Sequence, residues 1–233
     1  MSFLFIALWG ISIANANPEL VLLEQQHPQE YSRLMSLTPI PTRAGHLRFV
    51  GSELANAKWA PLYLKRYTSG KESTAVRSAL LDLIHRSLGA LPEEVTSSYS
   101  QEPEKIRASI LDMTEFGIVD PEQAQKDSSP LVRAAFIRQV AKSPQASNQF
   151  VINALQDDDV MVLADAARAA HQKECTEGIP YLANLVIIQD NVVALRALYA
   201  LSKLDLPYAR TLVQQHNLME SPYKNLALFA KRL

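Results

Sequence analysis

Apolar and polar positions follow a helical period through most of the chain after residue 45. Apolar or small residues recur at intervals of three and four, which predicts amphipathic helices with one buried stripe each. The clearest stripes are Val76, Ala79, Leu80, Leu83 and Ile84 in one segment, and Val193, Ala197, Ala200, Leu201 and Leu204 in another. The pattern therefore predicts an all-α protein.

These helices recur as a repeat. Each begins at an aliphatic residue, which in five of the six is followed by a basic or small one, at intervals of 29, 30, 26, 30 and 31 residues. The starts are Leu47-Arg48, Val76-Arg77, Ile106-Arg107, Val132-Arg133, Val162-Leu163 and Val193-Ala194. A second apolar pattern lies between several of them, around residues 150–155, 179–186 and 206–213. The repeating unit is therefore a pair of helices.

One of these pairs carries a recognisable sequence. The run Gly178-Ile179-Pro180-Tyr181-Leu182-Ala183-Asn184-Leu185, then Asp190 and Val193-Ala194-Leu195-Arg196-Ala197-Leu198, resembles the short HEAT-like repeat also found in phycobilin lyases. The resemblance covers roughly residues 45–233. It implies a right-handed α-solenoid of about six to seven helix pairs, in which the second helices line the concave side.

An aspartate precedes several of the Val-led helices, as the resemblance implies. We expect these carboxylates to cap the free N–H groups of the next helix and to complement its dipole. They are Asp127, either Asp157 or Asp159, and Asp190, while Pro130 and Pro222 are expected in first turns.

The chain also departs from the repeat. Leu163 and Ala194 stand where the family has an arginine after the valine. The segments 92–100 and 120–126 have few large apolar residues and predict short, irregular second helices.

The N-terminus has the pattern of a targeting segment. Residues 3–13 are apolar but too few to span a bilayer, and Ala14-Asn15-Ala16 matches a signal-peptidase site. We predict a signal peptide over 1–16, an extended leader or N-terminal cap over 17–44, and a repeat domain over 45–233. The mature protein is then periplasmic or secreted in a bacterium, without an integral membrane span. An uncleaved signal anchor and a buried N-terminal helix are the alternatives.

Composition narrows the function classes. Only 7 Gly and a single Cys disfavour turn-rich β folds, glycine-loop nucleotide binders and disulfide scaffolds. A formal net charge of -1 argues against a nucleic-acid partner. The charge is unevenly placed, however, with a basic segment over 43–71 and an acidic one over 82–129.

The sequence contains no motif of a known catalytic or metal site. Its five histidines are scattered over separate repeats, and the hydrolase and metalloprotease motifs are absent. His171 and Cys175 have the spacing of a ligand pair but lack further ligands, and 157–159 is an acidic turn without the EF-hand pattern. We therefore predict no catalytic residue, metal or cofactor.

Two sets of residues are candidate partner-binding positions. The first is a ridge of amides and tyrosines on the second helices: Gln149, Asn153, Tyr181, Asn184, Tyr208, Arg210 and Gln214. The second is a basic and aromatic patch: Lys58, Trp59, Tyr63, Lys65, Arg66 and Tyr67. Its aromatic residues also fit the first inter-repeat core, with the lysines simply solvated.

These features favour an exported, non-enzymatic scaffold or adaptor that binds a protein or peptide partner on its concave face. The second hypothesis is an accessory enzyme or prosthetic-group chaperone related to phycobilin lyases. The third is a scaffold tethered to the membrane by an uncleaved signal anchor.

Overall fold

The computed structural model describes residues 55, 57, 60–188 and 190–233 of the chain. This part contains twelve α-helices and three short 3₁₀ turns, with no β-strand among its residues. The all-α prediction is thus confirmed. The predicted signal peptide (1–16) and leader (17–44) lie outside the described residues.

The chain divides into two compact units between Val95 and Thr96. In the first, α6 (Ala60–Thr68) packs against α7 (Thr74–Leu88). Ser73 caps α7 by accepting a hydrogen bond from the Val76 N–H, and Gly89 ends the helix at φ 78°, where a side chain would be strained. The four-residue helix α8 (Glu93–Thr96) lies at the division.

Long helices of the second unit pack one on the next in chain order. They are α9 (Glu104–Met113), α11 (Pro130–Lys142), α13 (Val160–Gln172) and α15 (Asn191–Leu204), and α17 (Lys224–Ala230) packs on α15. Small residues allow this close approach, since α13 alone buries Ala164, Ala166, Ala167, Ala169 and Ala170. Helices α11 and α13 are thereby each packed between two other long helices, and α15 packs between α13 and α17.

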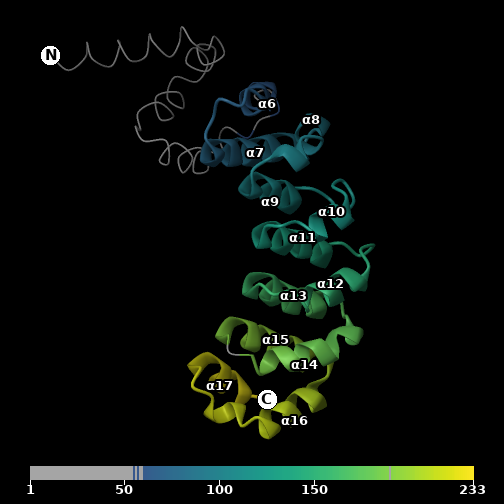
Figure 1. Cartoon of the computed structure of the whole chain (residues 1–233), viewed down its shortest axis with the longest axis vertical. Coiled ribbons are helices and arrows are strands. Elements are labelled where there is room, and N and C mark those ends of the chain that lie inside the picture. Colours follow the sequence, from purple (N-terminus) through teal and green to yellow (C-terminus); the bar gives the residue numbers. More distant parts are fainter. Residues whose placement is uncertain (1–54, 56, 58–59, 189) are drawn as a thin grey trace, which may run out of the picture. The chain divides into compact units, whose positions relative to one another are not determined.

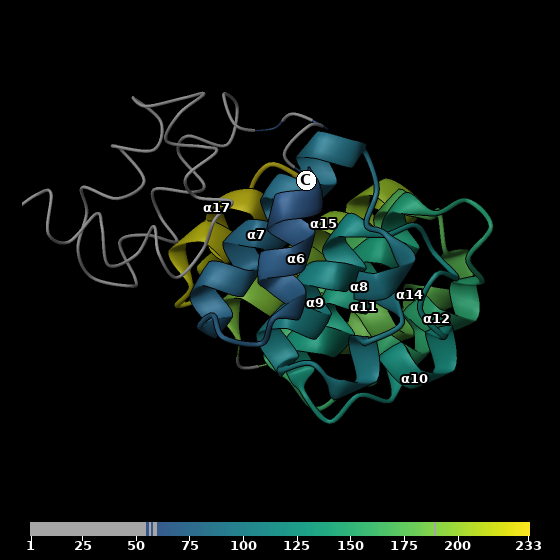
Figure 2. The ribbon, with the colours of Figure 1, turned by 90° about the horizontal axis from the view of Figure 1, so that it is seen from above.

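A second layer of shorter helices lies beside this stack (Figures 1 and 2). It consists of α10 (Pro121–Gln125), α12 (Asn148–Ala154), α14 (Ile179–Val186) and α16 (Leu206–Gln215). These helices pack on α11, α13 and α15. The second helices predicted around 150–155, 179–186 and 206–213 are confirmed, and α8 and α10 are as short as the sequence indicates.

Aspartates cap four of the described helices, and Asp120 caps α10 by accepting a hydrogen bond from the Glu122 N–H. Asp159, Asp190 and Asp205 accept hydrogen bonds from the N–H groups of Met161, Val193 and Tyr208. The Asp127 carboxylate does not reach an N–H group inside α11. It accepts a hydrogen bond at 2.9 Å from the N–H of Ser129, the N-cap residue, and also binds Arg107. Pro130 begins α11 as expected, whereas Pro222 precedes the N-cap of α17.

The arginine that follows the first aliphatic residue connects one helix pair to the next. Arg107 donates to both carboxylate oxygens of Asp127 at 2.8 Å, and Arg133 donates to those of Asp157 at 2.7 and 2.8 Å. Arg133 also donates to the Asp127 carbonyl at 2.9 Å. This series ends at α13, where Leu163 replaces the arginine.

The Arg133–Asp157 pair gives a pH-dependent contribution to stability. Burial by itself raises the pKa of Asp157, but hydrogen bonds from the Arg133 guanidinium and the Asp159 N–H outweigh burial and lower that pKa. A carboxyl whose pKa is lower in the folded than in the unfolded state stabilises the fold above about pH 4 and loses that contribution as the pH falls.

We expect Asp157→Asn to reduce the free energy of unfolding at pH 7 by about 1–2 kcal/mol. Urea unfolding should show that the difference in free energy of unfolding between this variant and the wild type becomes smaller between pH 5 and pH 3. Asp158→Asn is the control. The Asp158 side chain is 97% exposed and makes a single, longer contact of 3.4 Å with Arg133. A stability difference that stays constant down to pH 3 would contradict the explanation by an ion pair.

Candidate functional site

The predicted ridge is distributed over three helices of the second layer. Its residues on α12, α14 and α16 are exposed, apart from the half-buried Tyr181. Gln149 donates to the Asn153 Oδ1 at 2.8 Å, and the Arg210 Nε donates to the Leu233 carbonyl at 2.5 Å. Within the described residues, no hydrogen bond joins ridge residues of different helices. The ridge as a binding site stays a prediction.

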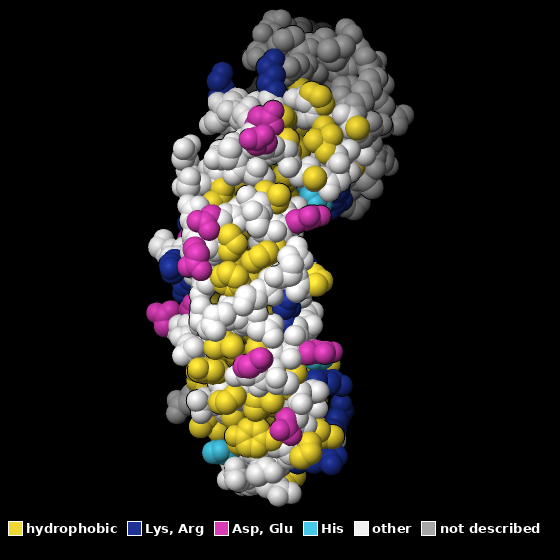
Figure 3. All heavy atoms as spheres, turned by 90° about the vertical axis from the view of Figure 1, so that its right-hand side faces the viewer, with side chains coloured by type: hydrophobic (Ala, Val, Ile, Leu, Met, Phe, Trp, Pro, Cys, Tyr) yellow, Lys and Arg dark blue, Asp and Glu magenta, His cyan; other side chains and the backbone are white. Residues whose placement is uncertain are grey.

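Apolar side chains are exposed near this ridge. Figure 3 shows the side on which α10, α12 and α14 lie, and hydrophobic side chains gather over its lower part with single acidic groups between them. The exposed apolar residues in this part of the chain include Ile187, Leu206 and Tyr208. The surface thus offers contact area as well as amide groups.

The second predicted patch is not an exposed aromatic surface. Tyr63 and Tyr67 are only 5% and 1% exposed, and burial raises the pKa of Tyr63 to about 12. The Arg77 guanidinium lies 4.5 Å from the centre of the Tyr67 ring, and Arg66 pairs with Glu72 at 2.6 Å. Both rings therefore belong to the α6–α7 core, as the alternative interpretation held, because helix α7 covers them. Lys65 is exposed, and Lys58 and Trp59 lie outside the described residues.

The isolated candidates for metal chemistry have structural contacts. The His171 ring packs edge-on to Tyr199, and Cys175 is buried with its Sγ 3.9 Å from Glu177. Burial raises the pKa of the Cys175 thiol. In the described part of the chain, no three His, Cys, Asp or Glu side chains are grouped as metal ligands. Nor does any helix there have the length and apolar character needed to cross a membrane.

A continuous charged surface, which the sequence analysis did not propose, lies on the long helices. We call it the stacked face and define it by Asp112, Arg138, Lys142, Asp165, Arg168, Arg196, Tyr199 and Lys203. Where one helix contributes more than one of these residues, they lie three, four or seven positions apart. Their spacing within α11, α13 and α15 is the signal that the sequence offers, but it does not show that residues of different helices form ion pairs with one another.

A row of ion pairs crosses the stacked face from α9 to α15. Arg138 donates to both oxygens of Asp112 at 3.0 and 2.7 Å, and to Asp165 at 2.8 Å. On its other side Asp165 accepts from Arg196 at 2.9 Å and from Arg168 at 3.3 Å. One carboxylate therefore serves three guanidinium groups. The hydrogen bonds that Arg138 donates to the Asp112 carboxylate raise the pKa of Arg138, which stays charged.

Aromatic rings form a second row beside these charges. Tyr199 lies between His171 and Phe229, with ring centres 5.6 and 5.9 Å away. The Lys203 ammonium is 5.4 Å from the centre of the Tyr199 ring. Tyr199 remains 44% exposed, so these contacts hold the ring in place without covering it.

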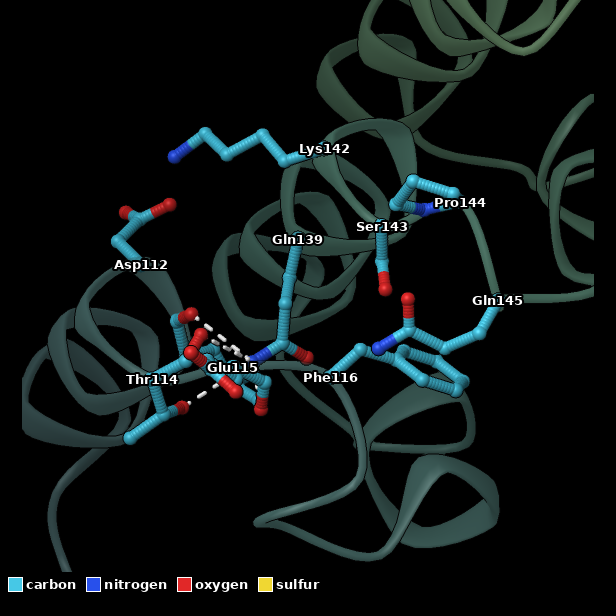
Figure 4. Close-up of a pocket in the computed structure, with 10 residues that line it drawn as sticks. Asp112, Thr114, Glu115, Phe116, Gln139, Lys142, Ser143, Pro144 and Gln145 are labelled. Carbon is cyan, nitrogen blue, oxygen red and sulfur yellow. Dashed lines mark hydrogen bonds between the residues drawn. The ribbon is translucent and has the colours of Figure 1, made fainter.

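A pocket of about 370 Å³ adjoins the same surface at the ends of α9 and α11. The buried Gln139 amide donates to the carbonyls of Leu111, Thr114 and Glu115, as Figure 4 shows for the turn after α9. Asp112 and Lys142 of the stacked face also line the pocket. Lys173 secures the next loop by donating to the carbonyls of three residues, Ser143, Pro144 and Ala146.

The pocket has the character of a packing gap at a fixed turn. The Gln139 nitrogen donates its hydrogen bonds to the loop that precedes α11, and the pocket is lined by both polar and apolar groups. Its polar residues offer hydrogen bonds but no nucleophile paired with a base. Comparison with known proteins adds no assignment: no protein-family model and no curated protein sequence matches this chain.

Proposed function

We propose that this protein is an exported, non-enzymatic scaffold or adaptor, built as a HEAT-like helical solenoid, that binds a protein partner. The observation that carries the proposal is the regular stacking of α9, α11, α13 and α15, each packed on the next. Such stacking leaves the same side of successive helices open to solvent, which suits an extended partner.

The chemistry of the open surfaces supports a protein partner. Tyr199 and Tyr208 combine apolar area with a polar end, and both are at least one third exposed. Tyrosine and arginine are the residue types that contribute most at protein interfaces. The ridge on α12, α14 and α16 and the stacked face are two such surfaces within the second unit.

We expect Tyr181→Ala combined with Tyr208→Ala to weaken capture of the native partner by about tenfold or more, because a buried tyrosine at an interface contributes at least 1–2 kcal/mol. The measurement is crosslinking in cells followed by quantitative mass spectrometry of the captured proteins. The exposed Thr211, on the same helix as Tyr208, supplies a control as Thr211→Ala. Unchanged capture by the tyrosine variants, with helical content intact, would remove the ridge from the proposal.

A further inference from the structure

We infer that the stacked face binds an acidic segment of a protein partner and that Tyr199 is the aromatic anchor of this contact. The inference rests on the proposed scaffold function and adds the surface and the chemical class of its partner. It concerns a different side of the second unit from the predicted ridge.

The first support is an excess of positive charge that the face does not neutralise. Its defining residues comprise five cations and two carboxylates. Asp112 and Asp165 are both already bound by Arg138. Lys142 and Lys203 are exposed and form no ion pair with any described residue. Their charge is therefore available to an acidic partner.

The guanidinium groups also retain free donors. Arg168 and Arg196 each direct one nitrogen to Asp165, and their side chains are 44% and 41% exposed. A guanidinium has five N–H donors, so most of those on Arg168 and Arg196 remain open to carboxylates of a partner. Because Asp165 holds both arginines in position, little side-chain entropy is lost when they bind.

The third support is the exposed ring among these cations. Tyr199 is flanked on its own helix by Arg196 and Lys203, three and four residues away, and is fixed by His171 and Phe229. A fixed ring surrounded by cations fits a segment that alternates carboxylates with an apolar or aromatic side chain.

Charge placement favours a protein segment over a nucleic acid. The carboxylates of Asp112 and Asp165 interrupt the row of arginines, so the cations do not form a continuous track for regularly spaced phosphates. Glu174 adds another negative charge just beyond α13. An acidic peptide can place its carboxylates beside the open donors and avoid these positions.

The test uses the full chain and a library of random 12-residue peptides displayed on phage. We expect selection on the wild type to enrich peptides rich in Asp and Glu that also carry an aromatic or aliphatic residue. A synthetic copy of an enriched peptide, measured by fluorescence anisotropy, should bind Lys142→Glu/Lys203→Glu at least tenfold more weakly. Lys71→Glu/Lys126→Glu is the control, because it changes the net charge equally at two exposed lysines outside the face.

A second part of the experiment tests Tyr199 as the aromatic anchor. Tyr199→Phe should keep affinity within about threefold, whereas Tyr199→Leu should lose about fivefold or more while the circular dichroism spectrum stays unchanged. Enriched peptides without acidic character, or equal losses in the two lysine double variants, would overturn the inference. Tighter binding of a 20-nucleotide RNA than of the peptide at the same salt concentration would also overturn it.

Failure of this inference is distinguishable from failure of the scaffold function. Neutral peptides that bind, are unaffected by Lys142→Glu/Lys203→Glu and are lost with Tyr181→Ala/Tyr208→Ala would move the partner to the ridge and keep the scaffold. No enriched peptide together with no captured partner would contradict both.

Discussion

Ala197→Asp is expected to unfold the C-terminal half of the second unit. Ala197 is fully buried in α15, which packs on α13, α14, α16 and α17. An aspartate there would bury a carboxylate without a partner, which costs about 3–5 kcal/mol. The site also has no room for a side chain larger than that of alanine. Thermal and urea unfolding followed by circular dichroism would show an early transition, and hydrogen exchange would locate it in residues 176–233.

The matched control for this change lies on the same helix. Val192 is exposed in the first turn of α15, where a negative charge is favourable to the helix dipole. The free energy of unfolding of Val192→Asp should therefore lie within about 0.5 kcal/mol of that of the wild type. Equal melting of the two aspartate variants would mean that the register of α15 is not the one described.

Asp165→Ala is expected to have the second-largest effect on stability. The Asp165 side chain is 10% exposed and joins Arg138, Arg168 and Arg196 from three helices. Its removal leaves three guanidinium groups close together without their shared carboxylate. We expect a loss of about 2–4 kcal/mol, less than for a fully buried ion pair because Arg168 and Arg196 can regain water.

Asp112 provides the comparison for Asp165. It also binds Arg138 through two oxygens, but its side chain is 36% exposed and it bridges only α9 and α11. Asp112→Ala should reduce the free energy of unfolding by about 1 kcal/mol or less. Similar losses from the two alanine variants, measured by urea unfolding, would show that the shared carboxylate has no special role.

Periodicity predicted much of the fold because helix formation and burial are both local in sequence. The apolar stripes of α7 and α15 are buried as expected apart from the half-buried Leu204, and Ala79, Leu83, Ala197 and Leu201 are fully inaccessible. The capping roles of Asp159 and Asp190 likewise follow from neighbouring residues. Asp127 differs from the expected cap, because it accepts a hydrogen bond from the N–H of the N-cap residue Ser129 while both of its oxygens bind Arg107, 20 residues away in the sequence.

The candidate surfaces depended more on tertiary packing. The sequence left both a buried and an exposed position open for Tyr63 and Tyr67, and the packing of α6 on α7 shows that they are buried. The stacked face was overlooked because its charges lie about one helix pair apart, as with Asp112, Arg138 and Asp165. No local pattern indicates that three such side chains share hydrogen bonds.

The sequence by itself therefore determined that the chain is helical, where most of its helices lie and which stripe each one buries. The tertiary structure decided which charges meet, since ion pairs between helices depend on how those helices stack and not on residue type alone. It also decided that one carboxylate, Asp165, serves three arginines and that the Tyr199 ring stays exposed beside them. The physical reason is that the buried side of a helix follows from the spacing of apolar residues along that helix, whereas a binding surface is formed by residues from several helices.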